Sequence, residues 1–354
     1  MDIKDFGAGI QRLIAGHDLD AATAHAMFCD VLGNQQPDLQ QGAFLSALVA
    51  KGETGDELHA AWRAIDEIDT VHVTPAVDEA LCENSGTGMD GLNTINVSTA
   101  AALVAAAGGV RMARHGARAL SSQCGTVDMA ESLGIDVECD AATVARSIER
   151  AGIGLFNGMS PQVHPAALGR ILSQIRFGST LNIAASLAHP ARPTLALRGV
   201  YHPALCERVA RLMQAIGYQR ALVVCGSDAE SGRHMDEISL CGSTQVCELA
   251  DGQLSHYRIE PEAFGIVRHP LAAVLRQGSP EEERARFQAL LEGRGEPALA
   301  DFVSLNAGAI LWLAGRAPGL PEGVSTARAL LASGAAHSRL ELWQNAQQGA
   351  ATLQ

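Results

Sequence analysis

The first seventy residues carry apolar side chains at the three- and four-residue spacing of α-helices. Polar turns and glycines divide the pattern into four blocks, at about 3–16, 18–33, 38–52 and 54–70. Asp18 or Asp20 can cap the second block, and Thr54 with Glu57 has the spacing of a capping box for the fourth. The pattern predicts four helices and therefore a small N-terminal helical domain over residues 1–70.

From residue 71 onward, short apolar runs alternate with helical patterns. Short strands are predicted at 71–74, 80–82, 110–113, 153–156, 194–197, 221–225 and 245–249. Helices are predicted at 100–107, 126–133, 141–151, 163–175, 279–293, 299–315, 325–334 and 335–348. The helix at 163–175 interrupts the alternation, and the last four helices close the chain. This order predicts an α/β domain with a mostly parallel central sheet.

Glycines cluster just after the second predicted strand, at Gly86, Gly88 and Gly91. Glycine allows a positive φ and a close approach of the backbone to a ligand. Ser98 or Thr99 is expected to cap the helix at 100–107, whose free N–H groups favour an anion. The next strand ends on the basic run from Arg114 to Arg118. We therefore expect these segments to converge on a phosphate-bearing ligand.

The glycine cluster matches neither of two common nucleotide motifs. The Gly-x-Gly-x-x-Gly pattern of dinucleotide-binding proteins leads directly into a helix, whereas Asn93–Asn96 intervenes here. A P-loop requires Gly-Lys-Ser/Thr, which does not follow.

A second candidate site is the acidic pair Asp236-Glu237, which follows the strand predicted at 221–225. Carboxylates at that edge of a parallel sheet lie where ligands bind, and hard oxygen ligands suit Mg²⁺. A solvated acidic turn is the alternative interpretation. His115 and His164-Pro165 likewise have a structural alternative, a packed histidine and the start of a helix.

Composition and charge narrow the class of protein. The 354 residues are 47% hydrophobic, enough for a sizeable core and two domains. The net charge of −13 argues against nonspecific binding to a nucleic-acid backbone. No apolar run is long enough to span a membrane, and Met1–Asp5 lacks a signal pattern. None of the eight cysteines forms Cys-x-x-Cys, so we expect reduced thiols and a cytoplasmic protein.

Several motifs in the right order resemble the anthranilate phosphoribosyltransferase family over nearly the whole chain. The family's glycine motif stands here as Gly86-Thr87-Gly88-Met89-Asp90-Gly91, followed by Asn96-Val97-Ser98-Thr99. Its basic motif stands as Arg114-His115-Gly116-Ala117-Arg118, and its serine motif as Ser121 to Asp128. The metal motif stands as Asp236-Glu237, and Leu305-Asn306-Ala307 also fits.

The resemblance implies a fold similar to nucleoside phosphorylases, usually in a homodimer. Part of 160–190 would join the helical domain of residues 1–70, and residues 71–354 would form the α/β domain. The implied reaction transfers the phosphoribosyl group of phosphoribosyl pyrophosphate (PRPP) to an aromatic amine and releases pyrophosphate, with Mg²⁺. Anthranilate, as in tryptophan synthesis, is the default acceptor.

The resemblance also implies roles for individual residues. The residues implied for catalysis are Arg114 and His115, with Arg114 in the place of the family's lysine. The residues implied for metal binding are Ser98, Asp236 and Glu237. The residues implied for substrate binding are Gly86, Thr87, Gly88, Asp90, Gly91, Asn96, Ser98, Thr99, Ala117, Ser122, His164, Arg170 and Arg176.

Three departures from the family concern the acceptor. Met89 replaces a glycine, and Ala117 replaces an asparagine that contacts anthranilate. The segment after His164 is shorter than in the family, so Arg170 and Arg176 are both candidates to bind the acceptor carboxylate. These departures predict a reshaped pocket and weak use of anthranilate. Local repacking that places another cation in the pocket is an equally open alternative.

The sequence raises three other functions. A different aromatic or heterocyclic acceptor would keep the same chemistry. A non-enzymatic, nucleic-acid-binding relative is disfavoured because the glycine motif and Asp236-Glu237 are present and the charge is −13. Pyrimidine nucleoside phosphorylases are similar in fold, but their Lys-His-Ser-Thr-Gly-Gly signature is absent from this chain.

Overall fold

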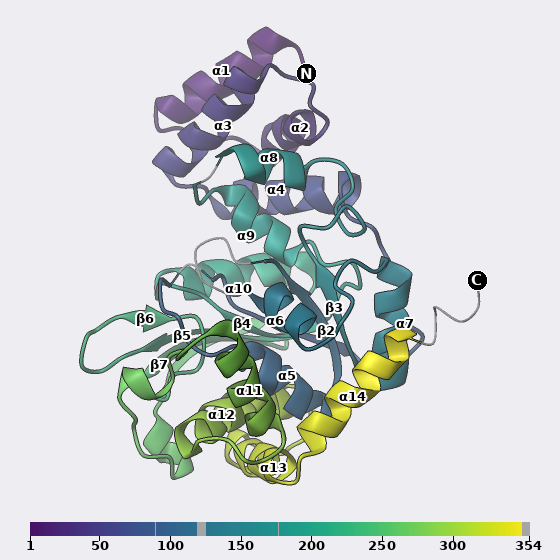
Figure 1. The fold of residues 1–354 in the computed structure, drawn as a ribbon. Helices are drawn as coiled ribbons and strands as arrows, with labels where there is room; N and C mark the ends of the chain where they lie inside the picture. Colours follow the sequence, from purple (N-terminus) through teal and green to yellow (C-terminus); the bar gives the residue numbers. More distant parts are fainter. Residues whose placement is uncertain (89, 119–124, 176, 349–354) are drawn as a thin grey trace.

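The computed structural model describes all residues except 89, 119–124, 176 and 349–354. A helical part sits above a larger α/β part, and the N-terminus lies at the far end of the helical part (Figure 1). The expectation of a helical domain beside an α/β domain with a mostly parallel sheet is confirmed. No helix among the described residues is long and apolar enough to cross a membrane.

The four predicted N-terminal helices are present. They are α1 (Ile3–Ile14), α2 (Ala21–Leu32), α3 (Asp38–Lys51) and α4 (Gly55–Ile68). Asp20, not Asp18, caps α2, and the capping box of Thr54 and Glu57 opens α4. Two later helices, α8 (Leu168–Ile175) and α9 (Thr180–Leu187), lie beside these four, and α9 packs against α3 and α4 (Figure 1).

The sheet runs in the order β3-β2-β1-β4-β5-β7-β8. Its five parallel strands are β1 (Leu81–Ser85), β2 (Arg111–Gly116), β3 (Ile153–Asn157), β4 (Leu195–Gly199) and β5 (Arg220–Ser227). The antiparallel strands are β6 (His234–Met235), β7 (Thr244–Ala250) and β8 (Gln253–Ile259). β6 pairs with β5 outside the main order.

Helices cover both faces of the sheet. The remaining α-helices are α5 (Val97–Ala107), α6 (Thr126–Ser132), α7 (Ala141–Ala151), α10 (Leu205–Ile216), α11 (Pro280–Leu291), α12 (Pro297–Leu313), α13 (Leu320–Ala332) and α14 (Ala335–Gln348). Two short 3-10 helices, Pro261–Phe264 and Leu271–Ala273, follow β8. α5 packs against α12 under the sheet, whereas α10 lies between the sheet and the helical part (Figure 1).

The alternation of strand side chains separates two cores. Leu222 and Val224 of β5 belong to the core with α5 and α12. Ala221 and Val223 of the same strand belong to the core that α10 shares with the helical part. The sheet therefore separates these two cores.

Several predicted elements were wrong. Residues 71–74 form no strand; Val71 and Val73 instead donate single hydrogen bonds to the carbonyls of Val163 and Pro190. The predicted helix at 163–175 begins only at Leu168, since residues 163–167 form turns around Pro165. The helices α9 and α10 and the strand β8 were not predicted. β8 is largely exposed and its polar sequence hides the alternation.

Asp69 joins the end of α4 to the start of α8 and is fully buried. Its carboxylate accepts hydrogen bonds from the backbone N–H groups of Ala166, Ala167 (3.0 Å) and Leu168 (2.7 Å). We predict that Asp69→Ala lowers the free energy of unfolding by about 3–5 kcal/mol, because three buried donors lose a charged acceptor. Urea unfolding measures it. Asp69→Asn should cost less, and a loss no larger than that of the exposed control Asp78→Ala would contradict the prediction.

Candidate active site

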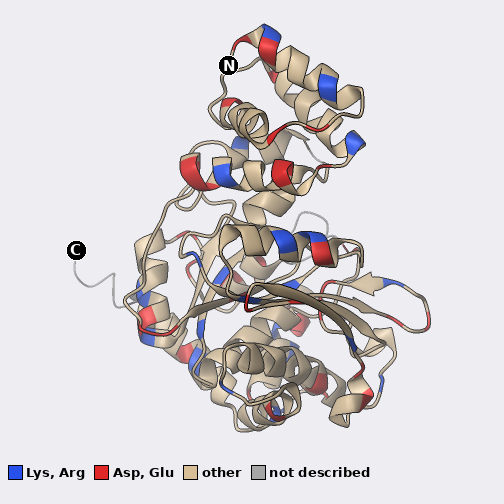
Figure 2. Cartoon of the chain, turned by 180° about the vertical axis from the view of Figure 1, so that it is seen from behind, with Lys and Arg blue, Asp and Glu red and all other residues tan. Residues whose placement is uncertain are grey.

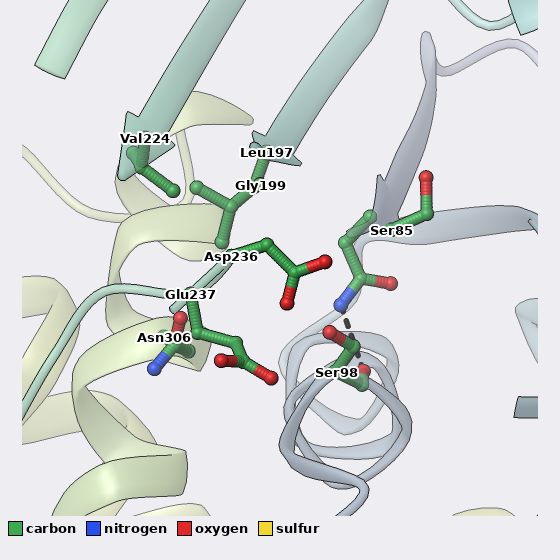
Figure 3. A pocket seen from close by; sticks show the side chains of 9 residues that line it. Ser85, Ser98, Leu197, Gly199, Val224, Asp236, Glu237 and Asn306 are labelled. Atoms are coloured by element: carbon green, nitrogen blue, oxygen red, sulfur yellow. Dashed lines mark hydrogen bonds between the residues drawn. The ribbon is translucent and has the colours of Figure 1, made fainter. Parts of the chain in front are cut away.

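A small pocket lies at the carboxyl ends of the parallel strands, where ligands bind in open α/β sheets. Side chains from β1, β4, β5, α5, α12 and the segment after β6 surround it (Figure 3). The lining residues are Asn84, Ser85, Ser98, Leu197, Gly199, Val224, Asp236, Glu237 and Asn306. The two predicted sites, the glycine turn and the acidic pair, therefore meet in one place.

The glycine turn is folded around the carboxylate of Asp236. The backbone N–H of Gly88 donates to Asp236 Oδ2 at 2.6 Å, and the Thr87 hydroxyl lies 3.3 Å from the same oxygen. A Cβ at Gly86 would lie 2.3 Å from that oxygen, so only glycine fits there. Gly88 and Gly91 have φ of 66°, as expected, whereas Gly86 does not have a positive φ. Gly86 is required for close approach, not for its φ.

Three carboxylates converge at the mouth of this turn. Oxygens of Asp90, Asp236 and Glu237 all lie within 4.8 Å of one another. The alternative interpretation, a solvated acidic turn, was wrong, because Asp236 is 7% and Glu237 9% exposed. Glu237 Oε1 accepts from the Thr94 hydroxyl at 3.2 Å, and its Oε2 has no partner among the described residues. A buried, unpaired carboxylate oxygen beside two like charges fits the donor set of a divalent cation such as Mg²⁺.

Burial raises the pKa of each of these carboxyl groups, and repulsion from a neighbouring carboxylate adds to the rise for Asp90 and Glu237. Burial is the larger cause for Asp90, and the charge of Asp236 adds to it, so its pKa rises to about 6. Burial likewise raises the pKa of Asp236, although the Gly88 N–H opposes the shift. The pKa of Glu237 lies well above its usual value because of burial and then the charges of Asp236 and Asp90. The cluster is therefore poised to gain from any bound positive charge.

Helix α5 begins one turn earlier than predicted. Its first residue is Val97 and its N-cap position is Asn96, so Ser98 and Thr99 lie in the first turn and do not cap it. Ser98 lines the pocket, and its backbone carbonyl accepts from Asn84 Nδ2 at 2.7 Å. The N-terminus of α5, with its favourable dipole for anions, faces the pocket beside the glycine turn.

Arg114 lies behind that first turn and does not line the pocket. It is 1% exposed; its Nε donates to Asn84 Oδ1 at 3.0 Å and its Nη1 to the Thr99 hydroxyl at 2.8 Å. Burial lowers its pKa to about 10, with the charge of Glu83 opposing the shift. If Arg114 contributes to catalysis as predicted, it would do so as a fixed positive charge behind α5, through its contacts with Asn84 and Thr99.

Three buried histidines form a cluster on the other face of the sheet. His115 Nε2 lies 3.3 Å from His164 Nε2, and His164 Nδ1 donates to the backbone carbonyl of Asp69 at 2.6 Å. His189, which sequence reasoning did not identify, donates from Nε2 to the backbone carbonyl of Ala113 at 2.9 Å. Burial lowers the pKa of all three, to about 4 for His189 and well below the usual value for His115. The cluster is therefore neutral at physiological pH.

The candidates for acceptor recognition are not brought together. Ala117 follows β2 and is half-buried. Arg170 points into the helical part, where it donates to Gln41 Oε1 at 3.3 Å and to the Val31 carbonyl at 2.8 Å. Ser122, Arg176 and Met89, which carried other predictions for this region, lie outside the described residues.

Sequence reasoning also left four residues of the site without a role. Asn84 and Ser85 end β1 directly before Gly86, and both line the pocket. Asn306 on α12 donates to and accepts from the backbone of Ile238, and so holds the acidic segment against the helix. Arg198 is a single charge in the apolar strand β4. That isolated charge was the available sequence signal.

We predict that Glu237→Gln stabilises the metal-free protein, and more so as pH rises. A carboxyl group whose folded pKa is raised causes no loss of stability below its unfolded pKa. As the pH rises from the unfolded pKa to the folded pKa, such a group makes the folded protein progressively less stable. Glutamine does not ionise, so the thermal midpoint should rise by about 2–4 °C at pH 8 and change little at pH 4. Calorimetry at both pH values measures it, with the exposed Glu230→Gln as control. A lower midpoint for Glu237→Gln at pH 8 would contradict the prediction.

Comparison with known proteins places this geometry in a family. Residues 78–337 match the model for the α/β domain of a glycosyl transferase family, and residues 9–67 match the model for its helical bundle domain. The anthranilate phosphoribosyltransferase of Sorangium cellulosum is 38% identical, over 94% of this chain and 93% of that protein. The enzyme of the same name from Stenotrophomonas maltophilia is 40% identical over 94% of each chain.

Solved structures agree. Anthranilate phosphoribosyltransferase from Thermus thermophilus has a TM-score of 0.86 and 34% identity, covering 96% of this chain and 99% of its own. The Saccharomyces cerevisiae enzyme in complex with PRPP and Mg has a TM-score of 0.85 at 24% identity, covering 98% and 99%. The matches span both the helical and the α/β part, and this chain belongs to the anthranilate phosphoribosyltransferase family of glycosyl transferases.

Proposed function

We propose that this protein transfers the phosphoribosyl group of PRPP to the amino group of anthranilate and releases pyrophosphate. The observation that carries the proposal is the convergence of the glycine turn, the N-terminus of α5 and three clustered carboxylates, two of them buried, at one edge of the sheet. Such a site offers N–H donors and a place for a cation to a ligand with several negative charges. The choice of anthranilate as the acceptor rests on the names of the relatives.

The donor would bind with its pyrophosphate between the turn at Gly86–Gly91 and the first turn of α5. Backbone N–H groups of the turn and the side chains of Asn96 and Ser98 would contact phosphate oxygens. Thr99, expected from the sequence to bind phosphate, is fully buried and accepts from Arg114, so it would hold that fixed charge behind them. Mg²⁺ would be held by Asp90, Asp236 and Glu237 with Ser98 nearby. Bound there, the cation would neutralise charge on the departing pyrophosphate.

In the reaction, the bond between ribose C1 and the pyrophosphate oxygen breaks, and a bond between C1 and the acceptor nitrogen forms. The nitrogen then loses one proton. The histidine cluster is neutral, so its imidazoles have lone pairs available; His115 is the member on the strand that ends beside the site. An aryl ammonium is strongly acidic, so even an imidazole of low pKa can accept its proton.

A second candidate is the same chemistry on another aromatic or heterocyclic acceptor. Two observations favour it. Ala117 has no polar side-chain atom for a ring substituent, which removes a hydrogen bond of about 0.5–1.5 kcal/mol. Arg170 is already engaged by Gln41 and Val31, so it is not free to bind a carboxylate. A carboxylate acceptor would need a cation from elsewhere.

Charge does not favour a nucleic-acid-binding function. Acidic and basic residues are interspersed along the helices and loops, and the net charge is −13 (Figure 2).

Release of pyrophosphate from PRPP tests the proposed function. We expect Mg²⁺-dependent turnover with anthranilate at a kcat/KM of about 10⁴–10⁸ M⁻¹s⁻¹, the usual range for an enzyme on its own substrate. Asp236→Asn should remove several kcal/mol of transition-state stabilisation, which lowers kcat/KM on the order of a thousandfold. Glu230→Gln, outside the pocket, is the matched control.

The same assay over a panel of aromatic acids, neutral anilines and heterocycles separates the two candidates. A better acceptor than anthranilate would establish the second candidate. No pyrophosphate release with any acceptor, at saturating PRPP and Mg²⁺, would refute both.

We further propose a homodimer formed through the helical part. Large apolar side chains are exposed on α1 (Ile3, Ile14) and α3 (Leu39, Val49), and Leu39 is 90% exposed. Two helices that pack together and expose apolar residues present a surface that gains from being covered. We expect Leu39→Glu to shift the protein to monomer in sedimentation velocity. The equally apolar, exposed Leu342→Glu on α14 should leave the dimer intact; a monomeric wild type would end the proposal.

A further inference from the structure

Arg198 is a buried guanidinium at the centre of the molecule. It lies near the end of β4, opposite Ser85 of β1, and is 1% exposed. Its Nη1 donates to the Ser85 hydroxyl and its Nη2 to the Ser186 hydroxyl. Its Nε has no partner among the described residues. Its positive charge also opposes the rise that burial causes in the pKa of Glu83 and of Asp236, so the guanidinium acts on two buried carboxyl groups as well as on the two hydroxyls.

The two serines belong to different parts of the structure. Ser85 is the last residue of β1 and directly precedes Gly86, so it sets where the donor turn begins. Ser186 lies in the last turn of α9, which packs against α4 of the helical part; Trp62 of α4 also donates to the neighbouring Leu187 carbonyl at 3.0 Å. Arg198 therefore joins the donor turn to the helical part through one planar side chain.

The same side chain lies beside the histidine cluster. The Ser186 carbonyl is 3.5 Å from His115 Nδ1. The positive charge of Arg198 also lowers the pKa of His115, after the larger effects of burial and of the two neighbouring histidines. A movement of Arg198 would therefore affect both the residue that begins the turn and the histidine cluster.

Direct contact with the donor does not explain the residue. Ser85, Leu197 and Gly199 line the pocket, whereas Arg198 between them in β4 does not. Strand alternation accounts for this, because Leu197 and Gly199 face the pocket and Arg198 faces the opposite side.

We propose that Arg198 is a positioning residue that holds the Ser85-Gly86 turn in register with α9, and so fixes the donor site relative to the histidine cluster. This inference rests on the proposed transferase function. Its physical basis is that a small misplacement of two reactants costs rate even when each still binds. The arginine fork can reach both hydroxyls at once, whereas a lysine ammonium would be a single point charge.

The test compares Ser186→Ala and Arg198→Lys with the wild type. Ser186→Ala removes the link to α9 and leaves the pocket residues in place. We expect kcat to fall about tenfold or more in both variants, while KM for PRPP stays within about twofold. Ser333→Ala is the matched control, because Ser333 makes the same hydrogen bond to the carbonyl three residues earlier at the end of α13, as Ser186 does in α9, but has no arginine partner. Its kcat should equal that of the wild type.

Three results would overturn the inference. The first is wild-type kcat in both variants. The second is a rise in KM for PRPP with kcat unchanged, which would indicate direct contact with the donor. The third is a loss with anthranilate but not with aniline, which lacks the carboxylate and would reveal direct recognition of the acceptor's acid group.

An inactive wild type would refute the proposed function but would not refute this inference. In that case, hydrogen exchange tests the positioning role of Arg198. Amides of residues 85–95 should exchange faster in Ser186→Ala and Arg198→Lys than in the wild type, and unchanged exchange would overturn the inference. Arg198→Met, which also removes the charge, is interpretable only where its thermal midpoint stays near that of Arg198→Lys.

Discussion

The structure depends on the burial of the Asp236 carboxylate against the glycine turn, at a position where Gly86 has no side chain to block it. The carboxylate takes the Gly88 N–H at 2.6 Å, and the missing Cβ at Gly86 leaves room for it. The segment that carries it crosses β4 where Gly199 likewise has no Cβ, since one would lie against the Asp236 backbone. One glycine directly after β1 and another at the end of β4 thus allow the acidic segment to reach this edge of the sheet, where Asn306 hydrogen-bonds to its backbone.

The sheet divides the chemistry as well as the core. Asn84, Arg114 and the start of α5 lie on one face, where negative charge would be bound. Ser85, Arg198 and the histidines lie on the other, toward the helical part. Because adjacent residues of a strand point to opposite faces, Asn84 and Ser85 serve different sides although they are neighbours in sequence. A reaction between two substrates can therefore be arranged across one strand end.

Much of this could be predicted from the sequence, for reasons that differ from element to element. The four N-terminal helices have caps and regular apolar spacing, and the parallel strands have short apolar runs. The glycine turn could be found because glycine has few other reasons to recur so closely. The start of α5 was placed too late because Ser98 and Thr99 look like caps, whereas their hydroxyls serve the pocket and Arg114. Burial of the acidic pair could not be read from adjacent acids, since it depends on Gly86 and Gly199, far away in the sequence. Arg198 left a sequence signal as the one charge in an apolar strand, whereas His189 became visible only when the segment after α9 was placed against Ala113 of β2.

The depth of Arg114 gives its identity a meaning that its charge alone does not have. Burial lowers its pKa to about 10, which still leaves the guanidinium fully charged in the cell. The unperturbed pKa of a lysine is roughly two units lower than that of an arginine, so the same burial would bring a lysine's pKa toward neutral pH. Arginine here secures a permanent cation where lysine would behave as a proton-dependent one. The exchange of one basic residue for the other therefore changes whether the field behind α5 varies with the acidity of the surroundings.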